Sequence, residues 1–283
     1  MAGQLRVGHD GDAAPALVRL SFVLPSHNEI SLLGSTVTNL VTGLEGRELS
    51  YEILIVENGS SDGSLRLARM LAAQLEQVRL LHLPIGDYGA ALAAGFRAAR
   101  GEIVVNFDVD YYDLAFLDAA LSILEDDKIA IVLASKRAPG ASDRRPLHRR
   151  LLTAGFAAAL RFLLDLQATD AHGMKAMRRS DLAPIVEESR LRKSLFDVEL
   201  IVRATRGGLQ LRELPASVVE RRPPRTGIAR RAVEGLVGAV HLRFILGGTQ
   251  AAGEKGRHRW PARRRLLDRA WSVLTRGRTG HSV

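Results

Sequence analysis

The chain of 283 residues contains no cysteine, which excludes a disulfide framework and a thiolate metal site and fits a reducing compartment. It also lacks any uninterrupted apolar run approaching the roughly 20 residues that a helix needs to cross a bilayer. Aromatic residues make up only 5% of the chain. Because no aromatic stacking surface or nucleic-acid recognition motif stands out, we expect no nucleic-acid partner.

The first residues do not resemble a secretory signal. Residues 1–16 carry Asp10, Asp12 and several glycines where a signal would have an apolar stretch. We expect residues 1–18 to be a disordered leader and the protein to be cytoplasmic.

Acidic residues are scarce in the C-terminal part of the chain. Residues 221–283 hold 15 Lys+Arg but only 3 Asp+Glu, a balance of +12, which leaves −3 for residues 1–220 out of the total of +9. Such asymmetry indicates an anionic partner. Apolar residues at helical spacing in 233–244 and 266–274, among arginines and Trp271, suit a peripheral helix on an anionic membrane surface, at its inner face. Packing of the first stripe against the rest of the protein fits the pattern equally well.

Strand and helix patterns alternate through the first half of the sequence. Apolar runs predict strands at 20–24, 53–56, 78–83, 103–107 and 129–134, and helical spacing predicts helices at 30–44, 64–75, 88–100 and 114–124. We expect Gly101 to close the helix 88–100. This rhythm predicts an α/β fold with a mostly parallel central sheet and helices on both faces. Further on, helices are expected at 147–166 and 196–206 and a strand at 209–219.

Residues 104–110 (VVNFDVD) form the most informative segment. A buried apolar strand stops at two carboxylates, Asp108 and Asp110. Ligands of open α/β sheets bind beyond the carboxyl ends of the strands, and carboxylates there suit Mg²⁺ or Mn²⁺ that in turn holds a diphosphate. The alternative is a solvated turn in which Asp113 caps the next helix.

Four segments, in order along the chain, resemble the motifs of the family 2 nucleotide-sugar glycosyltransferases. Residues 23–29 (VLPSHNE) resemble V-x-P-x-x-N-E, 56–64 (VENGSSDGS) resemble V-D-D-G-S-T-D-G-T, 87–95 (DYGAALAAG) resemble N-x-G-x-x-x-A-x-x-x-G, and 108–110 stand at the family's D-x-D. Each motif alone is weak, but four in order and in strand context are specific. The likeness implies a GT-A (nucleotide-diphospho-sugar transferase) domain over 19–228, followed by a basic extension over 229–283.

Within that family, the chain is more similar to the polyprenyl-phosphate sugar synthases, the dolichyl-phosphate mannose synthases and glucosyltransferases. Residues 135–137 (SKR) resemble G-S-R, 149–153 (RRLLT) resemble R-R-L-x-S, 196–200 (FDVEL) resemble F-D-V-E-L, and 219–225 resemble V-x-R-x-x-G-x-S-K. Two positions depart from the pattern. Tyr112 stands where relatives often have glutamine, and Asn58 replaces the second aspartate of the turn that recognises the base.

The resemblance implies an inverting transfer of mannose or glucose from a nucleoside diphosphate sugar, GDP-mannose or UDP-glucose, to polyprenyl phosphate. The residues expected to line the nucleotide pocket are Pro25, Asn28, Glu29, Asn58 and Asp108. For Asn28 and Glu29, a role in starting the next helix is compatible with nucleotide contact.

The residues expected to act on the metal, phosphates and sugar are Asp110, Arg137, Arg149, Asp197 and Arg221. Asp110 would ligate the metal, and Asp108 would reach it through water or contact the ribose. Arginine suits phosphate because its guanidinium binds two oxygens at once. A phosphate monoester is already ionised at neutral pH and needs no general base, so Asp197 would orient the sugar or acceptor, or else be an acid favoured by the helix dipole.

Two other functions remain open at this point. One is a glycosyltransferase with a small soluble acceptor such as a phosphorylated acid. The other is a non-catalytic nucleotide-sugar-binding protein, which the departures at Asn58 and Tyr112 leave open.

Overall fold

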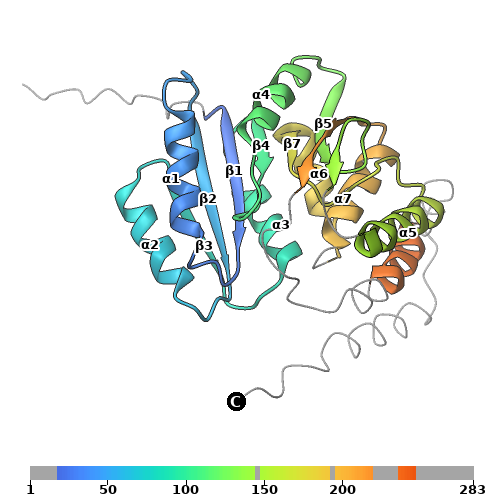
Figure 1. The fold of residues 1–283 in the computed structure, drawn as a ribbon, viewed down its shortest axis with the longest axis horizontal. Helices are drawn as coiled ribbons and strands as arrows, with labels where there is room; N and C mark the ends of the chain where they lie inside the picture. Colours follow the sequence, from blue (N-terminus) through green and yellow to red (C-terminus); the bar gives the residue numbers. More distant parts are fainter. Residues whose placement is uncertain (1–17, 144–146, 192–194, 219–234, 247–283) are drawn as a thin grey trace, which may run out of the picture. The chain divides into compact units, whose positions relative to one another are not determined.

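The computed structural model describes residues 18–143, 147–191, 195–218 and 235–246 (Figure 1). The chain divides into two compact units. The sheet unit comprises Met1–Asp143 and Ala168–Arg221, and the helical unit comprises Arg144–Gln167 and Arg222–Val283. The domain boundaries that the sequence suggests near residues 18 and 228 adjoin or fall in residues that the structure does not describe.

A seven-stranded sheet forms the centre of the sheet unit (Figure 1). In spatial order its strands are β3 (Val78–Leu83), β2 (Tyr51–Asn58), β1 (Leu20–Ser26), β4 (Ile103–Asn106), β7 (Lys175–Arg178), β5 (Ile129–Ser135) and β8 (Gln210–Pro215). Strand β7 is antiparallel to both of its neighbours, and every other neighbouring pair is parallel. The chain runs outward from β1 to β3 and resumes with β4 on the other side of β1, so the strand order reverses between β1 and β4.

The helices of the sheet unit are α1 (Leu33–Leu44), α2 (Ser64–Gln74), α3 (Tyr88–Ala98), α4 (Leu114–Ile123), α6 (Arg179–Glu188) and α7 (Leu195–Arg206). Adjacent residues of a strand point to opposite faces of a sheet. Phe22 of β1 shares a core cluster with Val37 and Leu40 of α1. Its neighbour Val23 instead meets α3 at Gly95, where an added Cβ would lie 2.4 Å from Val23 Cγ1. Helices α1 and α3 therefore cover opposite faces.

The remaining helices follow this division. Helix α2 packs on α1, and α4 lies beside α1, since an added Cβ on Gly43 would meet Leu114 of α4. Helices α6 and α7 contact α3 and each other. Because both faces are covered, β1, β4 and β5 are buried along their whole length and are mostly apolar.

The predicted fold class, a mostly parallel sheet with helices on both faces, is confirmed. The strand predicted at 78–83 has the same bounds as β3, and the other predicted strands and helices of the first half occur with ends shifted by a few residues. The strand predicted at 209–219 is β8 followed by β9 (Ser217–Val218), which pairs with β6 (Ser142–Asp143). The sequence did not predict β7 or α6.

Gly101 does not close helix α3, contrary to the prediction. The helix ends at Ala98, and Ala99 is its C-cap. Gly101 instead lies against the backbone of β1, where a Cβ would stand 2.6 Å from Leu20 C and from Ser21 N. The glycine is required by this close approach of two backbone segments.

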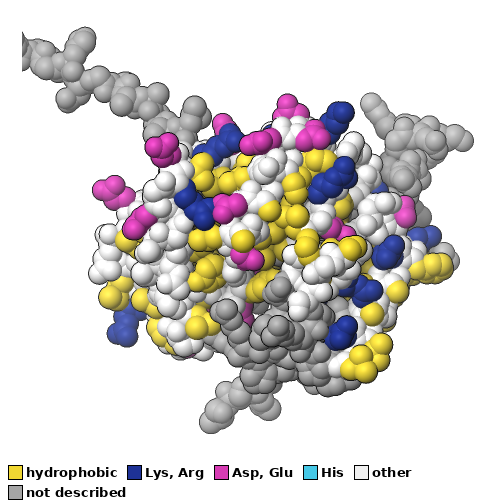
Figure 2. All heavy atoms as spheres, turned by 45° about the horizontal axis from the view of Figure 1, so that its top comes forward, with side chains coloured by type: hydrophobic (Ala, Val, Ile, Leu, Met, Phe, Trp, Pro, Cys, Tyr) yellow, Lys and Arg dark blue, Asp and Glu magenta, His cyan; other side chains and the backbone are white. Residues whose placement is uncertain are grey.

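The helical unit contains α5 (Leu147–Leu164) and the helical segment 235–246. The two helices are in contact: Arg243 Nη1 donates a hydrogen bond of 2.7 Å to Leu163 O, and a Cβ on Gly235 would lie 2.5 Å from Phe156 Cζ. Basic and hydrophobic side chains are interleaved toward the right of Figure 2, the side on which α5 is labelled in Figure 1. Among the described helices, none is both long and apolar enough to cross a membrane.

Candidate active site

The polar residues predicted for the site gather where β1, β2 and β4 end. Parallel strands place their carboxyl ends at one edge of a sheet, and the crevice for a ligand opens where the strand order reverses, here between β1 and β4. Loops follow these strands at residues 27–32, 59–63 and 107–113.

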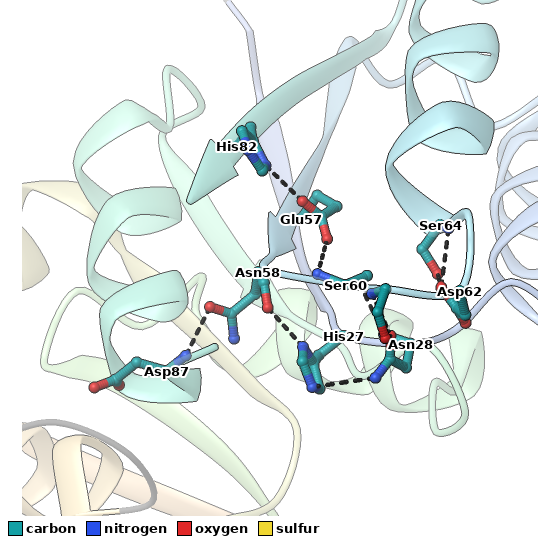
Figure 3. A network of polar contacts seen from close by, with 10 residues as sticks. His27, Asn28, Glu57, Asn58, Ser60, Asp62, Ser64, His82 and Asp87 are labelled. Atoms are coloured by element: carbon teal, nitrogen blue, oxygen red, sulfur yellow. Dashed lines mark hydrogen bonds and ion pairs between the residues drawn. The ribbon is translucent and has the colours of Figure 1, made fainter. Parts of the chain in front are cut away.

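The loops after β1 and β2 are tied to each other by hydrogen bonds (Figure 3). Asn28 N donates to Ser60 Oγ at 2.9 Å, and Asn28 Oδ1 accepts from Ser61 N at 2.8 Å. Asn28 adopts a left-handed conformation with φ of 55°, which asparagine tolerates better than most residues. Glu29 N donates to Ser64 Oγ at 2.8 Å. Both predicted residues are thus part of a pre-ordered turn.

Asp62 holds the start of α2 within the same network. Its Oδ1 accepts from Ser64 N at 3.0 Å and from Ser64 Oγ at 2.6 Å, and its Oδ2 accepts from Ile30 N at 3.1 Å. Burial raises the pKa of this carboxyl, but the hydrogen bonds from Ser64 and Ile30 lower it further than burial raises it, so the pKa lies below its ordinary value. Asp62 is therefore an ionised structural acceptor at neutral pH.

Glu57 performs a similar task at the end of β2. Its buried carboxylate accepts from Ser60 N at 2.7 Å and from His82 Nδ1 at 2.6 Å. Burial raises the pKa, while these hydrogen bonds and the charge of His82 lower it more, so the pKa of Glu57 is lowered overall. This residue fixes the turn that presents Asn58.

Asn58 links three segments of the edge (Figure 3). Its Oδ1 accepts from Asp87 N at 2.8 Å, and its carbonyl oxygen accepts from His27 Nδ1 at 2.6 Å. Asp87 in turn caps α3 by accepting from Ala90 N at 3.0 Å. Gly59, with φ of 64°, lets the chain pass close to Gly86, where a Cβ would lie 2.8 Å from Gly86 N.

The two aspartates after β4 lie on a tight turn. Asp108 N donates to Tyr111 O and Tyr111 N donates to Asp108 O, both at 3.1 Å, so that Val109 and Asp110 form the tip. Val109 is buried, and its carbonyl oxygen accepts from Thr36 Oγ1 of α1 at 2.6 Å. The turn therefore has a fixed place at the sheet edge, with Asp110 partly exposed.

Asp108 lies in a region of excess negative charge. Burial raises its pKa to about 6; the charge of Lys175 lowers the pKa, whereas the charges of Asp110 and Asp197 raise it. Tyr88 on α3 donates its hydroxyl to Asp108 Oδ1 at 3.1 Å. Burial and the charges of Asp108 and Asp197 raise the pKa of Tyr88 well above its ordinary value, so this hydroxyl remains a neutral donor.

Lys175 and Asp197 form a buried ion pair beside Asp108. The Nζ atom lies 3.0 Å from Asp197 Oδ1 and donates to Gly173 O at 2.9 Å, and both side chains are buried. Asp197 Oδ2 has no hydrogen-bond partner among the described residues. Asp197 lies in the first turn of α7, where an acid is favoured by the helix dipole. Its side chain is buried against Lys175.

Glu199, two residues further on, has a different role. Its carboxylate accepts from Arg190 N at 2.9 Å, from Leu191 N at 2.6 Å and from Arg203 Nε at 2.8 Å. It is a satisfied structural acid, whereas Oδ2 of Asp197 has no hydrogen-bond partner among the described residues.

A third group of polar residues lies at the end of β5. Ser135 Oγ accepts from Arg137 N at 3.1 Å and shares a hydrogen bond of 2.7 Å with Thr169 Oγ1. Lys136 Nζ lies 3.0 Å from Asp170 Oδ2. Burial, together with the negative charges of Asp113, Asp170 and Asp108, raises the pKa of Tyr111 to about 12. This places the β5 group next to the Asp108 turn.

Two residues that follow the predicted metal ligands Asp108 and Asp110 in the sequence have structural roles. Asp113 accepts from Ala115 N at 2.8 Å and caps α4, as the alternative interpretation of this segment predicts. The Tyr112 hydroxyl accepts from Asn39 Nδ2 of α1 at 3.1 Å, and its ring contacts Phe107 with centroids 6.3 Å apart. Both side chains are therefore engaged away from the turn tip at Asp110.

The structure brings most of the predicted residues to one edge of the sheet unit: Pro25, Asn28, Glu29, Asn58, Asp108, Asp110, Arg137 and Asp197. Arg137 is exposed there. Arg149 lies on α5 of the helical unit, and its side chain is outside the description, as is the whole of Arg221.

Sequence reasoning missed Tyr88 and Lys175. Strand β7 (KAMR at 175–178) has a basic residue at each end, so no local pattern marks Lys175 as buried. Within the described ranges, no three His, Asp or Glu side chains converge to hold a metal by themselves. A cation at Asp108 and Asp110 would need further oxygens from a ligand.

The chain is similar in sequence to known glycosyltransferases. The chain is 29% identical over 209 residues to glycosyltransferase AglD of Haloferax volcanii, covering 72% of this chain and 33% of that protein. It is 29% identical over 217 residues to dolichyl-phosphate beta-glucosyltransferase ALG5A of Trichomonas vaginalis, covering 71% of this chain and 66% of that protein. The chain thus spans a third of the first relative and just under two thirds of the second.

Among solved structures, glucosyl-3-phosphoglycerate synthase of Mycobacterium tuberculosis in complex with UDP superposes with a TM-score of 0.59 at 20% identity, covering 79% of this chain and 80% of the other. The same enzyme is known with Mn²⁺, UDP-glucose and phosphoglyceric acid. This likeness confirms the expected GT-A fold. The family model "Glycosyl transferase family 2" matches residues 21–185, more than half of the chain, and the chain therefore belongs to glycosyl transferase family 2.

Proposed function

We propose that this protein is an inverting glycosyltransferase that moves a hexose from a nucleoside diphosphate sugar to polyprenyl phosphate at a membrane surface. The observation that carries the proposal is the group of carboxylates at the end of β4 and the start of α7, beside two hydrogen-bonded loops at the switch point of a family 2 chain.

The donor nucleotide would lie over the ends of β1 and β2, against Pro25, Asn28, Glu29 and Asn58. These loops are already ordered by hydrogen bonds, so binding would cost little further loss of conformational entropy. The Asn58 oxygen is used by Asp87 N, which leaves the side-chain amide nitrogen as the group that would donate to the base.

The donor set at Asp108 and Asp110 fits Mg²⁺ or Mn²⁺. Both ions prefer oxygen ligands. The pKa of Asp108 is raised to about 6, first by burial and then by the charges of Asp110 and Asp197, and a bound cation would favour its ionised form. A bound cation would supply Lewis-acid stabilisation to the departing diphosphate. Because two carboxylates do not complete a coordination shell, the diphosphate oxygens of the donor would supply the remaining ligands.

Transfer with inversion is a single displacement. A phosphate oxygen of the acceptor forms the bond to the anomeric carbon while the bond from that carbon to the diphosphate breaks on the opposite face. The acceptor phosphate is already ionised, so Asp197 would orient a sugar hydroxyl through its unpartnered Oδ2 instead of removing a proton. Arg137, Arg149 and Arg221 are the proposed phosphate ligands.

The acceptor class rests on the polyprenyl-type relatives and on the basic C-terminal part of the chain. The named relative ALG5A is a dolichyl-phosphate glucosyltransferase, and residues 221–283 carry 15 Lys+Arg against 3 Asp+Glu. A small phosphorylated acid is the second candidate, because a solved structure of similar fold holds phosphoglyceric acid.

We expect the acceptor to be identified by direct competition. Purified protein with Mn²⁺ and radiolabelled UDP-glucose or GDP-mannose is offered a short, water-soluble prenyl phosphate and 3-phosphoglycerate in equal amounts. Label should move to the prenyl phosphate. Transfer to phosphoglycerate alone would establish the second candidate, and a protein that binds donor but transfers to neither would be a binding protein.

Asp110→Asn should reduce transfer by about 100-fold or more, because a metal-stabilised leaving group is worth several kcal/mol in the transition state. Asp113→Asn on the same loop is the matched control, since asparagine also caps helices, and it should retain activity within about threefold. Equal activity of the two variants would remove the metal from the mechanism.

Lys175→Met should lower the free energy of unfolding by about 3–5 kcal/mol, because it leaves the buried carboxylate of Asp197 without a counter-charge. Adding Asp197→Asn should restore part of that loss, so urea denaturation of the two single variants and the double variant should show strong coupling. Additive losses would mean that the two side chains do not interact.

A further inference from the structure

Helix α5 exposes a stripe of apolar and small side chains. Leu147 is 66% exposed, Leu151 63% and Phe162 88%. At 100° per residue these positions fall within an arc of about 60°, and the exposed Gly155 and Ala158 lie along the same stripe. A large aromatic ring so fully in contact with water is unusual for a protein surface, especially beside other apolar groups.

The helical segment 235–246 has a similar stripe. Val237 and Val240 are exposed, and Phe244 is 60% exposed. The sequence pattern left open whether this stripe packs against the rest of the protein; the structure leaves these side chains uncovered.

The two stripes lie on helices that contact each other. Gly235 meets Phe156 and Arg243 bonds Leu163, so the two helices run in the same direction along each other. Phe162 precedes Leu163 and Phe244 follows Arg243, the two residues joined by the hydrogen bond. Both exposed rings therefore lie at the same end of the two helices. We name Leu147, Leu151, Phe162, Val237, Val240 and Phe244 the apolar face.

The charged side chains on these two helices are basic. Neither α5 nor the segment 235–246 contains an aspartate or glutamate. Arg150 and Arg161 flank the stripe on α5, and Arg243 flanks the stripe on the segment; all three are exposed. Exposed Asp165 directly follows α5, so three arginines stand against one aspartate next to these apolar groups. Apolar groups beside an excess of basic groups complement the acyl boundary and the head groups of an anionic bilayer.

We propose that the apolar face docks on an anionic lipid bilayer, with α5 and the segment 235–246 lying in the plane of the interface. The inference rests on the proposed function, in which the acceptor is a membrane lipid. Neither helix can span the bilayer, so contact would be made from the surface. A second copy of the chain is a poorer occupant, because a symmetric contact would bring the three arginines toward their own equivalents.

The test is co-sedimentation of the full chain with vesicles of phosphatidylcholine, with and without about one third phosphatidylglycerol. Wild-type protein should bind the anionic vesicles, and Phe162→Ser/Phe244→Ser should weaken binding by about tenfold or more, since apolar area sets interfacial affinity. Met70→Ser is the matched control: Met70 is half-exposed on α2 of the sheet unit, and its loss should leave binding unchanged.

Both aromatic side chains are exposed, so the double variant should fold; an unchanged melting temperature and unchanged transfer to a water-soluble prenyl phosphate would verify this. Equal vesicle binding by wild type and the double variant would overturn the proposal. So would light scattering that shows a lipid-free dimer of the wild type and a monomer of the double variant. Vesicle binding that depends on the two rings, without any transfer to prenyl phosphate, would support the docking face while refuting the proposed acceptor.

Discussion

The site depends on the buried ion pair between the ammonium of Lys175 and the carboxylate of Asp197. Strand β7 runs antiparallel between β4 and β5, and its register sets Lys175 beside Asn106, the last residue of β4. From there Nζ neutralises Asp197 and lowers the pKa of Asp108. Without this positive charge, the carboxylates gathered at the sheet edge would face one another in a poorly solvated place, at a high cost in stability. With it, Asp108 and Asp110 remain as the carboxylates of the proposed metal site.

Order at the edge has a second source in the loops. Glu57 and Asp62 are ionised acceptors whose hydrogen bonds hold the turn after β2, and Asn28 joins this turn to the loop after β1. The residues proposed to meet the nucleotide are thus held by neighbours that do not meet it. Rigid placement of this kind lowers the entropy lost on binding and favours a defined orientation of the donor.

The sequence was sufficient for features encoded locally. An apolar run that ends at Asp108 and Asp110 identified β4 and its edge, and the polar turn at 57–63 identified the loop after β2. Features that depend on distant pairing were not accessible. Lys175 lies 69 residues from Asn106 in the sequence. No local pattern predicts that residues 175–178 form a short antiparallel strand between β4 and β5. Helical spacing predicted α7 but could not distinguish a solvated Asp197 from a buried one, because that difference comes from the strand packed against it. The sequence likewise predicted that Gly101 ends a helix, because the close approach of the β1 backbone, which requires glycine at this position, is also a distant contact.

The sheet edge holds the carboxylates of Asp108, Asp110 and Asp197 against the single ammonium of Lys175, and we propose that a metal–diphosphate ligand completes the balance of charge. The most direct measurement is the pKa of Asp108 by carboxylate ¹³C NMR, with Asp108→Asn used for assignment. Free protein should titrate at this position near pH 6. With Mg²⁺ and UDP or GDP, the carboxylate should remain ionised through that range. A pKa near the ordinary value of about 4 in the free protein, unchanged by metal and nucleotide, would contradict the account.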